Sequence, residues 1–197
     1  MNYKIIELEC PGCGAVITTE TEICPKCYRP IIISTFNSIS GLTTAELNQQ
    51  VNMYRNTINR NAENTPMSIS MAFCYLKLKL YDKAIFYFEK SIEENFDNSE
   101  VYFYAAIALL RGHKAFVAPR TVIDKAEEYL NGAIMIEERG IYYYFDAYIR
   151  YDHHYRKCYR VTPDYQELLV SAKRIGYSQT DVKELFELLG VDKPPCF

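Results

Sequence analysis

PMSISMAFCYLKLKLYDKAIFYFEKSIEENF, residues 66–96, is the stretch from which the fold can be predicted. Apolar and small side chains recur in it every three or four residues, as they do in a helix with one buried face. The spacing is interrupted near Asp82 and then resumes, so the stretch predicts two short helices that pack against each other. The small side chains of Ala72 and Ala84 would let the two backbones approach closely.

This pair of helices resembles a tetratricopeptide repeat. Ala72 and Tyr75 in the first helix, and Ala84 and Phe88 in the second, stand at the spacing of that family. The tryptophan, the leucine-glycine pair and the closing proline that the family usually carries are missing. The resemblance implies a stack of helical hairpins that binds proteins through a concave face made of first helices.

The rest of the chain shows the same helical spacing. Ala106 stands where the next repeat would place the counterpart of Ala72, but its partner helix arrives late, so residues 111–120 form an insertion between paired helices. An enlarged loop on a rigid scaffold is a candidate functional element, and a tolerated insertion is the alternative. The segments expected to be helical are 43–61, the two within 66–96, 100–110, the segment around 126–133, 141–159, 163–175 and 178–190.

Five tyrosines lie on one face of the predicted helix 141–159, namely Tyr144, Tyr148, Tyr151, Tyr155 and Tyr159. They form either a packing face whose hydroxyls reach the surface or an aromatic wall that binds a peptide.

Two C-x-x-C pairs near the N-terminus place four thiolates where a tetrahedral metal ion needs them. The pairs are Cys10 with Cys13 and Cys24 with Cys27. So short a segment cannot bury enough apolar surface to fold alone, and a metal supplies the missing stability. The module resembles a zinc ribbon, which implies one structural Zn²⁺. A rubredoxin-like iron site is the alternative, although Tyr28 stands where rubredoxins usually carry glycine.

The three other cysteines, Cys74, Cys158 and Cys196, are expected to be free thiols. Cys74 stands between aromatic residues of a repeat helix and should be buried. Cys196, near the end of the chain, should react readily with alkylating reagents.

Charge and composition exclude several classes of protein. The chain has 197 residues and a formal net charge of −3. Up to residue 36, the ribbon carries three basic residues against four acidic ones. Phosphate contacts need a cationic face, so nucleic acid is not the expected partner. The odd number of cysteines, without an export signal or an apolar run that could span a bilayer, predicts a cytoplasmic protein.

The sequence offers little for catalysis. His154 and Cys158 lie one helical turn apart, the spacing of a nucleophile and its base, but no third partner can be identified. There is no glycine-rich phosphate loop and no metalloprotease motif. We expect no enzyme.

The predicted partner site is the concave face of the first helices, with the insertion at its edge. Its apolar residues are Ile69, Phe73, Phe103 and Ile107, and its cationic loop residues are Arg111, Lys114 and Arg120. An open apolar groove would bind a protein or peptide, or a second copy of the chain, and the cations would select an acidic segment. Alternatively, residues 43–61 fold back and fill the groove, which makes the apolar residues part of the core.

The sequence therefore predicts a mainly α protein, an α-solenoid of tetratricopeptide-like hairpins with a small β zinc ribbon. The expected parts are the ribbon at 1–35, a linker at 36–42, the helical domain at 43–190 and a tail at 191–197. The expected function is that of a non-enzymatic cytoplasmic adaptor. The alternatives are a nucleic-acid-binding regulator that uses the ribbon and a rubredoxin-like electron-transfer protein.

Overall fold

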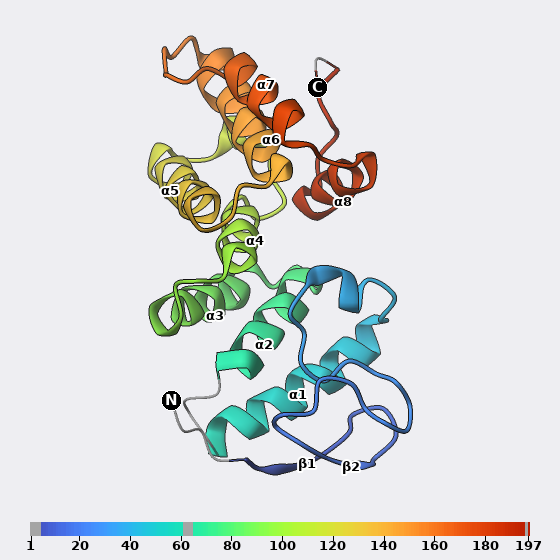
Figure 1. Ribbon diagram of the computed structural model, residues 1–197. Coiled ribbons are helices and arrows are strands. Elements are labelled where there is room, and N and C mark those ends of the chain that lie inside the picture. The colour runs from blue at the N-terminus through green and yellow to red at the C-terminus, as the bar shows by residue number, and fades with distance from the viewer. Residues whose placement is uncertain (1–4, 61–64, 196) are drawn as a thin grey trace. The chain divides into compact units, whose positions relative to one another are not determined.

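Helices dominate the computed structural model, which describes residues 5–60, 65–195 and 197 (Figure 1). Cys196, expected to react readily, lies outside the described residues. The chain divides into two compact units, Met1–Phe96 and Asp97–Phe197. The α-helices are α1 (Thr44–Arg60), α2 (Thr65–Lys77), α3 (Tyr81–Glu94), α4 (Ser99–Leu109), α5 (Arg120–Ile136), α6 (Gly140–Ile149), α7 (Tyr165–Ile175) and α8 (Gln179–Leu189).

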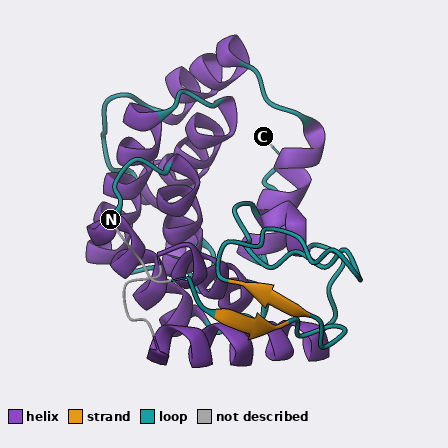
Figure 2. Cartoon of the chain, turned by 60° about the horizontal axis from the view of Figure 1, so that its bottom comes forward, coloured by secondary structure: helices purple, strands orange, loops and turns teal. Residues whose placement is uncertain are grey.

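The first unit begins with a two-stranded antiparallel sheet that lies beside α1 (orange in Figure 2). Its strands are β1 (Glu7–Glu9) and β2 (Val16–Thr18), with Leu8 opposite Ile17. We expected a strand at 15–19 and a hairpin turn after it. The strand is present, but it pairs with β1 upstream, because that pairing closes the first cysteine loop and buries Ile17.

The segment after the second cysteine pair packs on α1 and α2. The Tyr54 hydroxyl donates to the Ile31 carbonyl at 2.8 Å, the Gln50 amide donates to the Pro30 carbonyl at 2.6 Å, and the Ile33 N–H donates to Ser70 Oγ at 2.8 Å. Ile31 and Ile33 are fully buried. The ribbon and the first helices therefore share one core, and the boundary between the two units falls after α3 instead of after residue 35.

The predicted linker 36–42 is also part of this core. Phe36–Ile39 forms a short 3-10 helix in which Phe36 and Ile39 are both buried. The Lys77 ammonium at the end of α2 donates to the carbonyls of Ile39 and Ser40. The segment thus packs against the C-terminal end of α2.

Helices α2 and α3 form the expected hairpin. Ala72 and Ala84 are both fully buried, and the Phe73 ring lies edge-on to Phe88 with centroids 5.5 Å apart. Helix α3 begins at Tyr81, and Asp82 lies in its first turn without acting as the cap. The small residues lie at the helix contact, as the repeat resemblance implies.

The second unit contains two further hairpins, α4 with α5 and α6 with α7. Asn98 caps α4 by accepting from the N–H groups of Glu100 and Val101. The insertion is present between α4 and α5, and it holds a single 3-10 turn, Ala115–Val117, whose Ala115 is buried.

Helix α6 ends earlier than predicted. The sequence predicts a helix over 141–159, whereas α6 stops at Ile149 and continues as a π-helical turn, Arg150–His154, and a 3-10 turn, Tyr155–Lys157. Tyr144 and Tyr148 are buried, whereas Tyr155 and Tyr159 are more than half exposed. A π-helical turn holds only about one residue more than an α-helical turn, and tyrosines spaced three or four residues apart are too coarse a pattern to show where that change falls.

The last two helices are set by capping boxes. Asp164 caps α7, instead of the predicted Thr162-Pro163. The Asp164 carboxylate accepts from the N–H of Glu167, and the Glu167 carboxylate accepts from the N–H of Asp164. Ser178 and Asp181 cap α8 reciprocally, and Gly190 ends it with a φ of 65°, both as predicted. None of the described helices is long and apolar enough to cross a membrane.

Candidate metal centre and partner surfaces

The four predicted ligands converge at one point in the first unit. The Sγ atoms of Cys10, Cys13, Cys24 and Cys27 all lie within 4.8 Å of one another. Cys10 and Cys27 are 3.5 Å apart and Cys13 and Cys24 are 3.7 Å apart. A tetrahedral ion with metal–sulfur bonds of about 2.3 Å places its sulfurs about 3.8 Å apart, so the cluster fits such an ion.

Two equivalent turns bring the cysteines together. The Gly14 N–H donates to the Cys10 carbonyl at 2.9 Å, and the Tyr28 N–H donates to the Cys24 carbonyl at 3.0 Å. Both residues have positive φ, 70° at Gly14 and 58° at Tyr28. Tyr28 therefore keeps the left-handed conformation that glycine adopts most easily. Because Tyr28 adopts the conformation that glycine would have at this position, its presence does not distinguish a zinc site from an iron site.

The environment of the thiols favours a thiolate at Cys24. N–H groups of Cys27 and Lys26 point at its sulfur and lower its pKa to about 6. Burial raises the pKa of Cys10, although the Gly12 N–H donates to its sulfur at 3.4 Å. Cys10 and Cys24 are buried while Cys13 and Cys27 are exposed, so the ion would lie just beneath the surface.

The apolar part of the predicted partner face is buried. Ile69 and Phe73 lie on α2, which packs between α1 and α3, and Phe103 contacts the rings of Tyr142 and Phe145 on α6. The exposed fraction of these side chains, with that of Ile107, is at most 9%. The prediction that these four line an open groove is therefore wrong, and on α2 the alternative holds, since residues 44–60 cover that helix.

The cationic residues of the insertion are exposed but do not form one free cluster. Arg120 pairs with Asp124 at 2.6 Å on the first turn of α5. Arg111 is exposed and adopts a left-handed conformation with a φ of 51°. Lys114 is exposed too, and it lines a pocket of the second unit.

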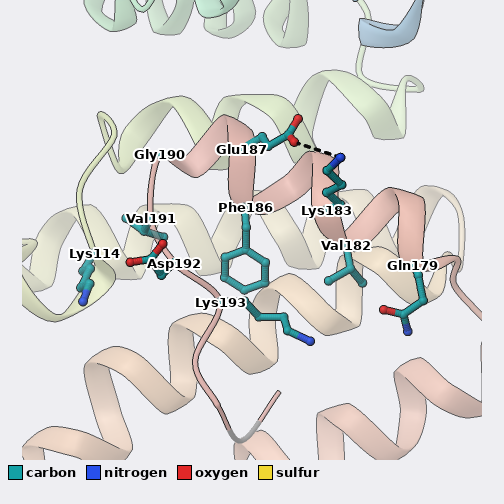
Figure 3. Close-up of a pocket in the computed structure, with 10 residues that line it drawn as sticks. All are labelled: Lys114, Gln179, Val182, Lys183, Phe186, Glu187, Gly190, Val191, Asp192 and Lys193. Atoms are coloured by element: carbon teal, nitrogen blue, oxygen red, sulfur yellow. Dashed lines mark ion pairs between the residues drawn. The ribbon is translucent and has the colours of Figure 1, made fainter.

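That pocket was not predicted from the sequence (Figure 3). Its volume is about 640 Å³, and it lies between α8 and the segment that follows it. Val182 and Phe186 of α8 point into it, and Val191 and Lys193 border its other side. The broad apolar side of α8, which the sequence assigns to a capping helix, was the available signal.

A buried polar network lies where α6 changes pitch. The Arg150 guanidinium is 3.2 Å from Asp146 and 4.0 Å from Glu127, and His154 Nε2 is 2.7 Å from the same Glu127 carboxylate. Burial raises the pKa of Asp146 to about 6. Cys158, expected one turn from His154, is exposed, whereas His154 is fully buried. Arg150 thus ties α5 to α6, because its positive charge is compensated by Glu127 on α5 and Asp146 on α6.

The fold and the cluster together define a tetratricopeptide-like helical protein with a four-cysteine site that could hold a metal ion. Neither the models of protein families nor the curated proteins give a match to the sequence. Among solved structures, one described as MamA MSR-1 C2 matches with a TM-score of 0.50 over 77% of this chain and 73% of that chain. MamA is a tetratricopeptide-repeat protein, and at 18% identity the likeness concerns the fold alone.

Proposed function

We propose that the chain is a non-enzymatic scaffold that binds a protein partner through its tetratricopeptide-like hairpins and holds one structural Zn²⁺. The observation that carries this proposal is the series of three antiparallel hairpins, α2–α3, α4–α5 and α6–α7. Helical hairpins of this kind present rigid surfaces, and natural solenoid proteins use such surfaces for binding. The free thiols of Cys74 and Cys158 are compatible with a reducing compartment such as the cytoplasm.

The metal supports the fold in this proposal and takes no part in chemistry. Four thiolates complete a tetrahedron, which leaves no open position for a substrate. Metal analysis of the freshly purified, reduced chain is expected to give one zinc per chain. Iron with the visible absorbance of a ferric thiolate would instead support the electron-transfer alternative.

The nucleic-acid alternative has less support from the surface of the ribbon. Arg29, one of the three basic residues of the ribbon, forms an ion pair with Glu46 of α1 at 2.7 Å, so its charge is already compensated. Lys26 is exposed, but acidic Glu20 and Glu22 are close to it in sequence. The described residues of this module, from residue 5 onward, therefore form no cationic track for phosphates.

The insertion is the part of the proposed partner surface that charge reversal can test. Lys114 and Arg111 are exposed at its start and would contact an acidic segment of the partner. Partners should be captured from native cells by the tagged, zinc-loaded chain and identified after cross-linking. Lys114→Glu is expected to reduce capture of the identified partner, whereas Lys173→Glu, an exposed change on α7, should not. Equal capture by the two variants would show that the insertion is not part of the partner-binding surface.

A further inference from the structure

The last residue of the sequence, Phe197, is held by four tyrosines. Its ring lies edge-on to Tyr144 at 5.5 Å and contacts Tyr151 at 5.4 Å, Tyr148 at 6.3 Å and Tyr165 at 6.3 Å, the last in a stacked arrangement. We call these four residues the tyrosine seat. They come from α6, the π-helical turn and α7, so a single aromatic ring from outside these elements bridges all three.

The segment that carries Phe197 is attached to the seat through that ring. The Val191 N–H donates to the Phe186 carbonyl at 3.3 Å, and the Phe197 N–H donates to the Pro194 carbonyl at 3.0 Å. Both bonds are local. Of the described residues 191–195 and 197, none has a hydrogen bond or ion pair to α6 or α7. A proline-rich segment anchored by one aromatic side chain is how short extended peptides bind to protein grooves.

The aromatic surface continues beyond Phe197 into the pocket beside α8. The Phe186 ring is 5.3 Å from Tyr148 and 6.4 Å from Tyr144, and it also lines the pocket of about 640 Å³ (Figure 3). One wall of that pocket is the segment 191–193 itself. The segment thus covers the tyrosines with its Phe197 ring and borders the open pocket with residues 191–193.

We propose that the tyrosine seat and the pocket over Phe186 form one peptide-binding groove, and that residues 191–195 and Phe197 occupy it as a ligand in cis. The external ligand would be an extended segment of a partner protein that presents an aromatic side chain after prolines, and it would displace Phe197. Three lysines, Lys114, Lys183 and Lys193, border the pocket against two acidic residues, Glu187 and Asp192. This small cationic excess suits an acidic flank on the ligand, and the aromatic anchor remains the main determinant of selectivity. This inference rests on the proposed protein-binding function and names its ligand class.

The test uses the full chain and a labelled peptide. The peptide is VDKPPSF, residues 191–197 with Cys196→Ser, acetylated and amidated so that no terminal charge contributes. Phe197→Ala empties the seat, so this variant is expected to bind the peptide at least about 10-fold more tightly than the unmodified chain, whose own segment competes at high effective concentration. The peptide VDKPPSA should not bind.

Two further variants show where the peptide binds. In the Phe197→Ala background, Tyr165→Ala should abolish peptide binding, whereas Tyr143→Ala should not, since Tyr143 bonds Glu138 and is outside the seat. Phe197→Leu replaces Phe197→Ala should the latter unfold. A folded Phe197 variant that ignores the peptide, or that binds VDKPPSA equally well, overturns the proposal.

Three remaining outcomes separate this inference from its rivals. Self-association of the unmodified chain that is lost in Phe197→Ala would assign the groove to a second copy and overturn the partner peptide. If Tyr165→Ala captures the cellular partner as well as the unmodified chain does, the groove is not the partner site, and the proposed scaffold function is unaffected. If the zinc-loaded chain captures no partner but the Phe197→Ala variant still binds the peptide, the proposed scaffold function is rejected and the peptide-binding groove is retained.

Discussion

His153 lies on the π-helical turn with only 2% of its surface exposed, and its Nδ1 atom has no hydrogen-bond partner among the described residues. Burial lowers the pKa of His153 to about 4, and the nearby cations Lys157 and Arg120 and the neighbouring His154 act in the same direction, against Asp124. The neutral imidazole is therefore the form that the fold accepts. Acid must disturb the packing at this turn.

The first prediction concerns this residue. In the unfolded chain a histidine binds its proton below a pH of about 6.5, whereas folded His153 does so only near pH 4. The unfolded state thus binds more protons between these values, and stability falls as the pH drops, by up to about 3 kcal/mol. We expect His153→Gln to lose less stability than the unmodified chain between pH 6.5 and 4 in urea titrations. His113→Gln, the same substitution at an exposed position of the insertion, is the control variant.

The second prediction contrasts two thiols. Cys74 is fully buried on α2, and burial raises its pKa to about 12, whereas Cys158 is exposed. Because the thiolate is the form that alkylates, brief treatment of the native, metal-loaded chain should label Cys158 and leave Cys74 unmodified until the chain unfolds. Peptide mass spectrometry measures both sites at once. Rapid labelling of Cys74 would mean that α2 does not pack as described.

At the level of helices, α6 and α7 meet with almost no space between their ends. A Cβ atom at Gly140, the first residue of α6, would overlap the Gly176 carbonyl oxygen and lie 2.7 Å from that of Ala172. Both obstacles are backbone atoms, which cannot rotate away as a side chain would. The contact fixes how the start of α6 faces the end of α7.

The third prediction follows from that contact. Gly140→Ala should destabilise the chain by about 2 kcal/mol or more, because the added methyl group must push two backbones apart. Gly41→Ala is the matched control, since a Cβ at Gly41 meets nothing within 4 Å, and it should change stability by no more than about 0.5 kcal/mol. Thermal melts of the two variants measure the difference. Equal melting temperatures would contradict the close approach.

The sequence predicts those helices best whose ends are set by local residues. Helix α8 begins at a Ser178–Asp181 capping box and ends at Gly190, and α2–α3 follows from small residues at fixed spacing. The end of α6 could not be predicted, because the π-helical turn depends on the Asp146–Arg150–Glu127 contacts between helices. The pairing of β2 with β1, instead of with a strand further along the chain, could not be predicted either, because it depends on contacts beyond the local sequence.

The same distinction applies to the candidate sites. The cysteine cluster was predictable because two local turns, ending at Gly14 and Tyr28, aim each pair at the same point. The partner face was not predictable, because whether Phe73 is exposed depends on what covers α2. The proposed groove at Phe197 joins residues about fifty positions apart, and the spacing of the tyrosines alone favoured a packing face over an aromatic wall that binds a peptide.

On the scale of the molecule, the first unit joins the module that carries the candidate metal site to helices that would be expected to fold independently of it. The β1–β2 sheet has only three residues per strand, too few to be stable in water by itself. The carbonyls that follow the second cysteine pair accept from Gln50 and Tyr54 of α1, both fully buried. Loss of order in the ribbon therefore leaves buried polar groups of α1 without partners.

The fourth prediction is that removing the metal loosens α1 together with the ribbon. An unpaired buried donor costs about 1–3 kcal/mol, and two such donors lie on the same face of α1. Hydrogen exchange of the full chain should become faster after chelation in residues 5–39 and in α1, and less so in α3. Cys24→Ser should reproduce this pattern, whereas Cys158→Ser, an exposed cysteine outside the cluster, should not. Faster exchange confined to residues 5–35 would show instead that the ribbon folds apart from the helices, because the hydrogen bonds to Gln50 and Tyr54 would then carry no coupling.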